Sequence, residues 1–287
     1  MPLNMRVIDW LPLPPPPEMR HRSAPAVGIE LEYEEFDEDE GYPYLDSQRY
    51  WRAVGDGSLR NGGRELVSIP LSEDSVAEAL SVAESIVNAA GAVATTRCGL
   101  HTHMNMWPYT AGQMHSLITL YALIEPTIFS TYAIGRESNI FAVPLWRNTH
   151  QQQIIHEGVV SARSSVPSSR VLGPVTNIAA KYSALNMSSL IYHGTLEMRQ
   201  PYCSNNFEAI QSWVEFCFRL VREGTSYNDP VDVHNDYGLV GLEGFQEKLF
   251  GDRYEVNSEW QEQAEEAAIM TCGYVQERWQ DLTWEIR

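Results

Sequence analysis

The chain of 287 residues has few cysteines, few basic side chains and no long apolar run. Its four cysteines (Cys98, Cys203, Cys217 and Cys272) lie far apart, without the CxxC spacing of a metal knuckle or the density of a disulfide scaffold, which favours a reducing compartment. Lysine and arginine total 20 against 38 aspartates and glutamates, and the net charge of −18 disfavours general binding to nucleic acid or membranes. Without a signal peptide or an 18-residue apolar window, the chain is predicted to be soluble and cytoplasmic.

The sequence also lacks internal repeats and a second domain boundary. Four consecutive prolines, Pro14 to Pro17, favour an extended conformation, so residues 1–25 are expected to form a Pro-rich N-terminal arm. Residues 26–287 are then expected to form a single catalytic domain, since a 44% hydrophobic composition is sufficient for one large core.

Apolar residues at helical spacing predict four helices. The first is capped by Ser72 and ends at Gly91, and the second runs over 114–128, where Pro126 is expected to kink or interrupt it. The others cover 207–222 and 260–284. The acidic, turn-rich segment 34–46 is predicted to be a solvated loop. Three histidines in helical or loop segments are expected at the surface: His115, His150 and His156.

Three segments alternate between apolar and polar residues, as half-buried strands do. They are VGIELEY (27–33), LHTHMNM (100–106) and TLEMR (195–199). The alternation predicts an α+β fold in which helices pack on the apolar face of an antiparallel β-sheet.

The polar faces of these strands carry the candidate site residues. Taken alone, paired glutamates on a strand indicate a solvated face, and His103 could equally be a satisfied interior histidine. Taken together, Glu30, Glu32, His101 and Glu197 would share one face, and their mutual repulsion would require a cation. A set dominated by carboxylates favours Mg²⁺ or Mn²⁺ over zinc.

A fourth strand, within 56–71, places Glu65 in phase with Val67 and Ile69, which suggests a carboxylate on an otherwise apolar face. Either an arginine such as Arg60 or Arg64 pairs with it, or a metal ion does. Arg199, beside Glu197, could pair in the same way or hold a phosphate, for which a planar guanidinium is suited.

The ordered motifs GIELE (28–32), GRELVS (63–68), GLHTH (99–103), KYSALNMSSL (181–190) and GTLEMR (194–199) resemble those of the amidoligase family, relatives of glutamine synthetase and glutamate-cysteine ligase. The resemblance spans about residues 26–222. It implies a glutamine-synthetase-like antiparallel sheet that binds ATP and two or more divalent ions. By the same resemblance the metal ligands would be Glu30, Glu32, Glu65, His101 and Glu197.

The resemblance also implies the remaining roles. Arg199, Glu65 and Arg136 would be catalytic, and His103, Asp56 and Ser58 would contact substrate. The residues expected to contact the nucleotide are Arg199, Lys181 and Asn186. The chain lacks the N-terminal domain of glutamine synthetase, and the region after residue 225 matches no known pattern.

The implied activity is an ATP- and Mg²⁺-dependent ligation of a carboxylate to an amine through an acyl phosphate. Its substrates would be a small-molecule or peptide acid and amine, and an oligomer is possible. Two alternatives remain open. One is a metal-dependent hydrolase of the barrel type, with His193 and His234 as later ligands, and the other is a catalytically silent binding or assembly protein of the same fold.

Overall fold

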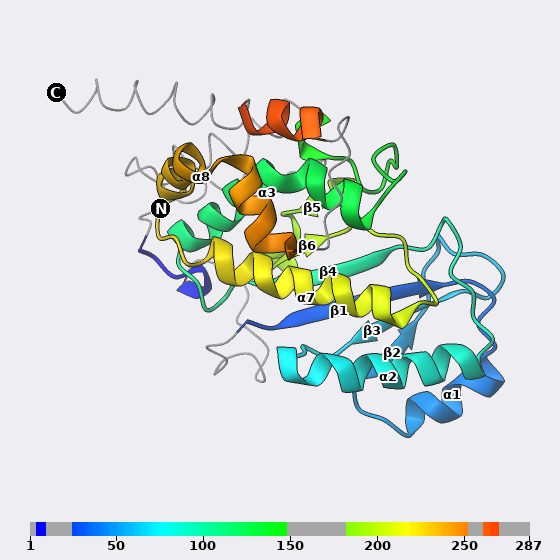
Figure 1. The fold of residues 1–287 in the computed structure, drawn as a ribbon. Coiled ribbons are helices and arrows are strands. Elements are labelled where there is room, and N and C mark those ends of the chain that lie inside the picture. The colour runs from blue at the N-terminus through cyan, green and yellow to red at the C-terminus, as the bar shows by residue number, and fades with distance from the viewer. Residues whose placement is uncertain (1–3, 10–24, 148–181, 252–260, 270–287) are drawn as a thin grey trace.

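The computed structural model describes residues 4–9, 25–147, 182–251 and 261–269. A sheet of six strands, paired antiparallel throughout, forms its centre in the order β2-β3-β1-β4-β6-β5 (Figure 1). The strands are β1 (Val27–Tyr33), β2 (Trp51–Val54), β3 (Arg64–Ser68), β4 (Leu100–Asn105), β5 (Leu185–Asn186) and β6 (Thr195–Met198). This confirms the predicted α+β class and the antiparallel sheet.

One face of the sheet is covered by α2 (Glu73–Ala89) and α7 (Phe207–Gly224), which lie in front of it in Figure 1. A further helix, α3 (Ala111–Tyr132), packs against α7 and against α8 (Pro230–Phe250). The smaller elements are α1 (Glu38–Asp46), α6 (Ser189–His193), the 3-10 turns Val7–Asp9 and Leu145–Arg147, and a helical segment over 261–269.

The alternation of β1 decides which face meets these helices. Ile29 and Leu31 are fully buried in the core, whereas Glu30 lies on the opposite face and keeps some exposure. On the same core face of β4, Thr102 Oγ1 accepts a hydrogen bond of 2.9 Å from the Trp213 indole of α7. The apolar stripe of α7 and the apolar faces of the strands therefore form one core, and the polar faces lie on the other side of the sheet.

Three of the four predicted helices match α2, α3 and α7, and 261–269 matches the start of the fourth, whose remainder lies outside the described residues. The expected interruption at Pro126 is wrong, because α3 continues through this buried proline to Tyr132. A capping box formed by Thr110 and Gln113 secures the start of α3.

The acidic segment 34–46 is not a loop over its whole length, because Glu38–Asp46 is α1. Asp37 caps this helix by accepting hydrogen bonds from two backbone amides. Three acidic side chains in the first turn stabilise the helix further, because they lie at the positive end of its dipole. His115 is also not at the surface: it is buried within α3. His150 and His156 lie outside the described residues.

Two further findings concern the periphery. Val7 is buried, and its backbone amide donates to Tyr109 O at 2.8 Å, so this part of the N-terminal segment is tied to the body. The division into an arm and one domain stays a prediction.

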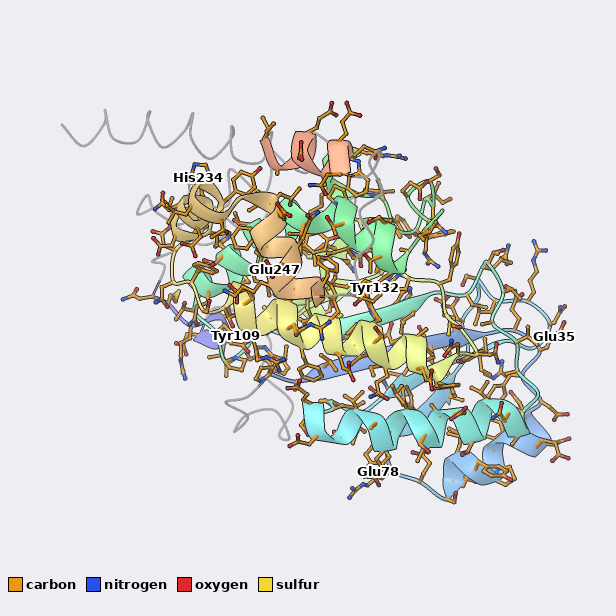
Figure 2. All side chains as sticks on the ribbon, in the orientation of Figure 1. Glu35, Glu78, Tyr109, Tyr132, His234 and Glu247 are labelled. Carbon is orange, nitrogen blue, oxygen red and sulfur yellow. The ribbon has the colours of Figure 1, made fainter. Side chains whose placement is uncertain are left out.

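Among the described helices, none combines the length and the apolar character that crossing a bilayer needs. Polar side chains such as Glu78 instead project outward from the helical layer (Figure 2).

Candidate active site

The register of four adjacent strands gathers the polar side chains of the motifs on the open face of the sheet. Glu32 on β1 is opposite Glu65 on β3, and Glu30 is opposite His101 on β4. On the other side of β4, His103 is opposite Glu197 of β6. Residues more than 160 positions apart in the chain therefore become neighbours across three strand pairs.

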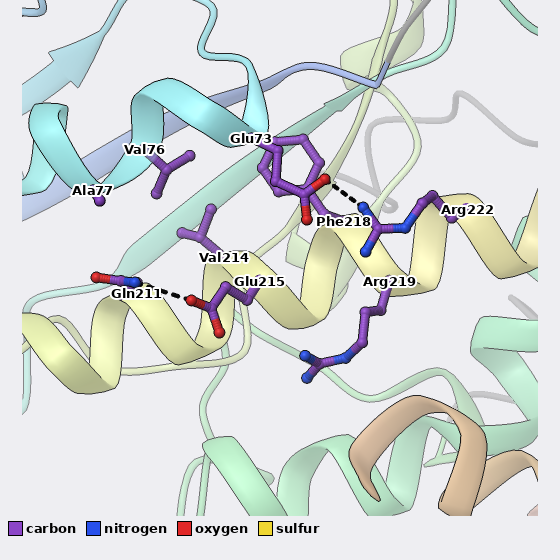
Figure 3. A pocket seen from close by; sticks show the side chains of 9 residues that line it. All are labelled: Glu73, Val76, Ala77, Gln211, Val214, Glu215, Phe218, Arg219 and Arg222. Carbon is purple, nitrogen blue, oxygen red and sulfur yellow. Dashed lines mark hydrogen bonds and ion pairs between the residues drawn. The ribbon is translucent and has the colours of Figure 1, made fainter.

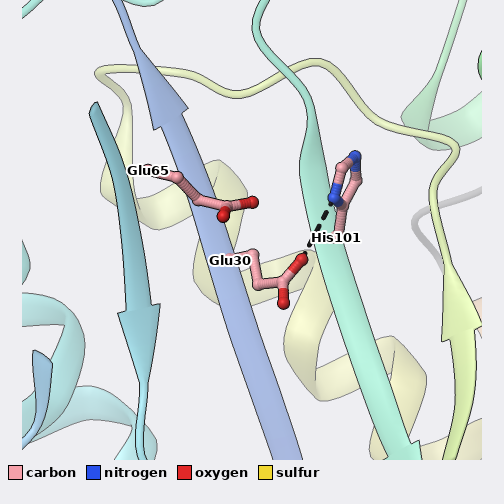
Figure 4. A group of neighbouring side chains, drawn as sticks. All are labelled: Glu30, Glu65 and His101. Carbon is pink, nitrogen blue, oxygen red and sulfur yellow. Dashed lines mark hydrogen bonds and ion pairs between the residues drawn. The ribbon is translucent and has the colours of Figure 1, made fainter. Parts of the chain in front are cut away.

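Glu30, Glu65 and His101 form the centre of this group (Figure 4). One ligand atom from each lies within 4.8 Å of the others, and His101 Nδ1 lies 3.3 Å from Glu30 Oε2. The Glu65 side chain reaches over β1 from β3, so it does not lie on an apolar face as expected. Leu66, which follows it, fills the core instead, and Val67 lies beside Glu30 on the open face.

In the part of the chain that the structure describes, neither Arg60 nor Arg64 forms an ion pair with Glu65, so arginine pairing does not account for this carboxylate there. Arg64 forms its ion pair with Glu38 of α1. The Glu65 carboxyl instead faces other acids, because Glu32 and Asp56 also form a group with it within 4.8 Å.

Glu32 is held by the segment that leads into β4. Its Oε2 accepts from Gly99 N at 2.5 Å, and its Oε1 lies 3.8 Å from His101 Nε2. A side chain at position 99 would collide with the His101 ring, so the glycine permits this close approach. Arg136 is buried nearby, where its guanidinium donates to Cys98 O at 3.3 Å and stacks over the Tyr202 ring.

Glu197 is buried at the β6 end of the site. Asn186 of β5 donates to its Oε2 at 2.6 Å, and Arg199 forms an ion pair with its Oε1. His101 Nδ1 lies 3.7 Å from the same Oε1. Arg199 is itself fixed, because its Nε donates to Phe141 O at 3.1 Å.

The electrostatics divide the carboxylates into two kinds. Although burial opposes it, the hydrogen bond with His101 and the close contact with His103, together with the charges of both rings, hold the pKa of Glu30 well below its ordinary value. The pKa of Glu197 is likewise lowered, because the charges of His103 and Arg199 outweigh its burial. Among the described residues Glu65 has no ion pair with a basic side chain, and burial together with repulsion from Glu30, Glu32 and Asp56 raises its pKa to about 8. The site thus contains more carboxylate charge than its own cations neutralise.

A cavity of about 790 Å³ opens above these residues. Besides the central acids and His101, its wall includes Asp56, Ser58 and three arginines, Arg97, Arg136 and Arg199. Sequence reasoning missed Arg97, which donates from Nη2 to Ser58 O at 2.7 Å and lies 3.4 Å from Glu34. In the sequence, only its position directly before the CGLHTH segment indicated that Arg97 could belong to the site.

Most of the predicted site residues thus meet in one place. His103, Asn186 and Glu197 share the polar face but are not among the residues that line the cavity. Lys181 lies outside the described residues. A smaller hollow between α2 and α7, which contains the Glu73–Arg222 ion pair and a Gln211–Glu215 hydrogen bond of 2.9 Å, brings no candidate residues together (Figure 3).

The fold and the site together define an α+β protein that gathers carboxylates, imidazoles and arginines on the open face of an antiparallel sheet. Residues 30–221, about two thirds of the chain, match the model of the family described as "Putative amidoligase enzyme". The chain belongs to this amidoligase family.

No curated protein matches the chain. Among solved structures it is similar to a bifunctional glutathione synthetase from Pasteurella multocida, with 10% sequence identity and a TM-score of 0.36. This match covers 88% of the chain and 49% of the other protein, so the chain spans about half the length of that synthetase.

Proposed function

We propose that this protein is an ATP- and Mg²⁺-dependent ligase that joins a carboxylate to an amine, forming an amide or isopeptide bond through an acyl phosphate. The observation that carries the proposal is the convergence of Glu30, Glu65 and His101 beneath a cavity that three arginines also line. Membership of the amidoligase family supports the same reaction class. The proposal includes a glutamine-synthetase-like sheet and one catalytic domain over 26–287.

The donor set fits divalent cations. Two groups of possible metal ligands share Glu65. One consists of Glu30, Glu65 and His101, and the other of Glu32, Asp56 and Glu65. The raised pKa of Glu65 indicates that the protein alone does not stabilise all these charges. Oxygen ligands with one imidazole suit Mg²⁺ or Mn²⁺, and Glu65 is positioned to contact two ions. Glu197 would add a ligand at the β6 end.

The reaction needs activation because a carboxylate and an amine do not condense in water. When bound, ATP would supply its terminal phosphoryl group to a carboxylate oxygen of the acid with loss of ADP. The amine would then attack the acyl carbon, the C–O bond to phosphate would break, and the nitrogen would release a proton to the departing phosphate or to water. Divalent ions held by Glu30, Glu65 and His101 would supply positive charge that offsets the charge of the phosphates.

The protein's own residues orient and stabilise the reacting groups. Arg199 would hold the transferred phosphoryl group, and its bonds to Glu197 and to Phe141 O fix the guanidinium plane. Arg136, whose pKa burial lowers, is fixed by Cys98 O and the Tyr202 ring, and it would contact phosphate or the acid. Asp56 and Ser58 would contact substrate at the opposite end, where Arg97 adds a cation.

Asn186 fits an indirect role better than contact with the nucleotide, because its amide is engaged with Glu197. The barrel-hydrolase alternative has less support: the sheet is open and antiparallel, whereas such barrels have parallel strands. His234, one of its proposed later ligands, lies on α8, which packs against α3.

The experiment is product analysis with the full chain. The protein is incubated with ATP, Mg²⁺ and a pooled metabolite extract, ADP is quantified, and new amides are sought by mass spectrometry. We expect ADP formation that depends on an acid and an amine, and its loss in Glu30→Gln and Glu65→Gln. Glu73→Gln, in the hollow between α2 and α7, is the matched control and should retain activity.

Two outcomes would contradict the proposal. Hydrolysis of an extract component without nucleotide would identify a hydrolase. Absence of Mg²⁺-dependent binding of a non-hydrolysable ATP analogue, measured by calorimetry, would identify a catalytically silent protein.

A further inference from the structure

The second histidine of the GLHTH motif lies behind the site rather than on its wall. His103 is mostly buried, and its two ring nitrogens face different groups. Nε2 lies 3.3 Å from Glu30 Oε1, in a bent contact that falls short of a linear hydrogen bond. Nδ1 faces away from the carboxylate, toward two hydroxyl groups.

These hydroxyls form a closed triangle with the ring. Thr195 Oγ1 lies 2.9 Å and Ser189 Oγ lies 3.1 Å from His103 Nδ1, and the two oxygens are 2.8 Å apart. Ser189 is buried at the start of α6, and Thr195 begins β6. Two different elements therefore fix the plane of one imidazole.

The triangle also determines where the ring carries its proton. If Nδ1 carries no proton, one hydroxyl donates to the other and the second donates to Nδ1, so both hydroxyl protons are used. If Nδ1 carries a proton and donates it to a hydroxyl, one hydroxyl proton is left without an acceptor among the described residues. The neutral ring then carries its proton on Nε2, and so does the cationic ring. In both forms an Nε2–H faces Glu30.

We infer that His103 is a positioning residue: oriented by Thr195 and Ser189, it restrains Glu30 so that the other carboxylate oxygen is presented to the cation. The inference rests on the proposed function, since it assumes that Glu30 binds a divalent ion. Glu30 Oε2, the oxygen that His103 does not contact, is the one that faces His101. Partners behind a metal ligand commonly change metal affinity 10- to 100-fold when they are removed.

The test measures Mn²⁺ affinity of the full chain from the electron paramagnetic resonance signal of free Mn²⁺, which requires neither ATP nor turnover. His103→Leu removes the donor, and we expect the Kd to rise at least about tenfold. His103→Gln keeps an N–H close to the position of Nε2 and should restore affinity to within about threefold of wild type. Thr195→Val, which is isosteric, should weaken binding by a smaller factor, and it keeps the test valid if His103→Leu misfolds.

His193→Leu is the matched control. Its ring is an edge-to-face neighbour of His103, with centroids 5.7 Å apart, yet within the described part of the chain it forms no hydrogen bond or ion pair with a carboxylate. The Mn²⁺ affinity of this variant should therefore stay within about threefold of the wild-type value. Wild-type affinity in both His103→Leu and Thr195→Val would overturn the inference. So would a second imidazole coordinated to Mn²⁺ that disappears in His103→Gln, because His103 would then be a ligand. If the wild type binds no Mn²⁺ at all, the metal-dependent function fails and this inference fails with it.

Discussion

Glu125 is the buried acid whose ionisation should most clearly control stability. It is fully buried in α3, and its Oε1 accepts from the Tyr121 hydroxyl at 2.5 Å. Its Oε2 accepts from the backbone amides of Leu145 and Trp146 at 2.7 and 3.2 Å. The carboxyl thereby ties α3 to the segment whose residues Ser138 to Phe141 line the cavity.

Burial raises the pKa of Glu125 from 4.5 to about 8, although the bonds from Tyr121 and the two amides oppose the rise. At neutral pH the folded protein keeps a proton that the unfolded chain has released. Stability from this group is therefore fully present below pH 4.5 and is lost as pH rises toward 8. At about 1.4 kcal/mol per pH unit, the loss between pH 5 and pH 8 is roughly 3 to 4 kcal/mol.

The measurement is urea unfolding followed by circular dichroism at several pH values between 5 and 8.5. Glu125→Gln cannot ionise but keeps an acceptor for the amides and a group that can bond Tyr121. We expect the wild type to lose stability relative to this variant as pH rises, and the difference between the two curves isolates Glu125 from other titrating groups. Glu78→Gln, at an exposed position of α2, should parallel the wild type. Parallel curves for wild type and Glu125→Gln would refute the reasoning.

Three further predictions concern the site and one turn. Saturating Mg²⁺ should raise the thermal midpoint of the wild type but not of Glu30→Gln, as scanning fluorimetry would measure, because only an intact ligand set binds the ion preferentially in the folded state. Arg199→Lys keeps the charge but loses the planar fork, so kcat should fall at least about tenfold with little change in thermal midpoint. Gly194→Ala should cost roughly 2 kcal/mol or more in unfolding experiments, because φ is 66° and the new Cβ would overlap the Trp107 indole. Gly91→Ala, also at positive φ but in open space, should cost less.

Of the six described strands, β1, β3, β4 and β6 could be predicted from the sequence because apolar and polar residues alternate in them, whereas the short strands β2 and β5 were not predicted. β1 has the predicted bounds, 27–33, and β4 and β6 differ from the predicted segments only at their ends. A half-buried strand encodes its two faces directly, so the open-face residues Glu30, His101 and Glu197 could be identified before any coordinates were known.

The helices that were missed have weaker local signals. α8 contains glycines at positions 238, 241 and 244, and Gly241 has a non-helical backbone, so its apolar spacing is broken. Its start is nonetheless typical, with Asp229 as the cap and Pro230 in the first turn. In α1, Pro43 and its neighbouring glycine and tyrosines indicate a turn, and its run of acidic residues is typical of a solvated loop as well as of a helix start.

Other features of the site and of the core could not be predicted because they depend on tertiary contacts. The place of Arg97 on the cavity wall depends on Ser58 and Glu34, which belong to other segments. The burial of His115 depends on α3 being enclosed on all sides, because most of its residues are buried and it lacks a single apolar stripe. The hydrogen bonds of Glu125 likewise come from a segment about twenty residues further along the chain.

The register of the sheet explains why the site and the core cannot be separated. A slip of one residue between β1 and β4 would turn Glu30 toward the helical layer and Ile29 toward the cavity. Burying an unpaired carboxylate would cost several kcal/mol, and exposing an isoleucine would cost roughly 2 to 3 kcal/mol more. The apolar residues beneath the sheet thus fix the register that brings the acids together. The repulsion among those acids is then a cost of the fold, and the proposed divalent cation would remove it, so metal binding and stability should be linked in this protein.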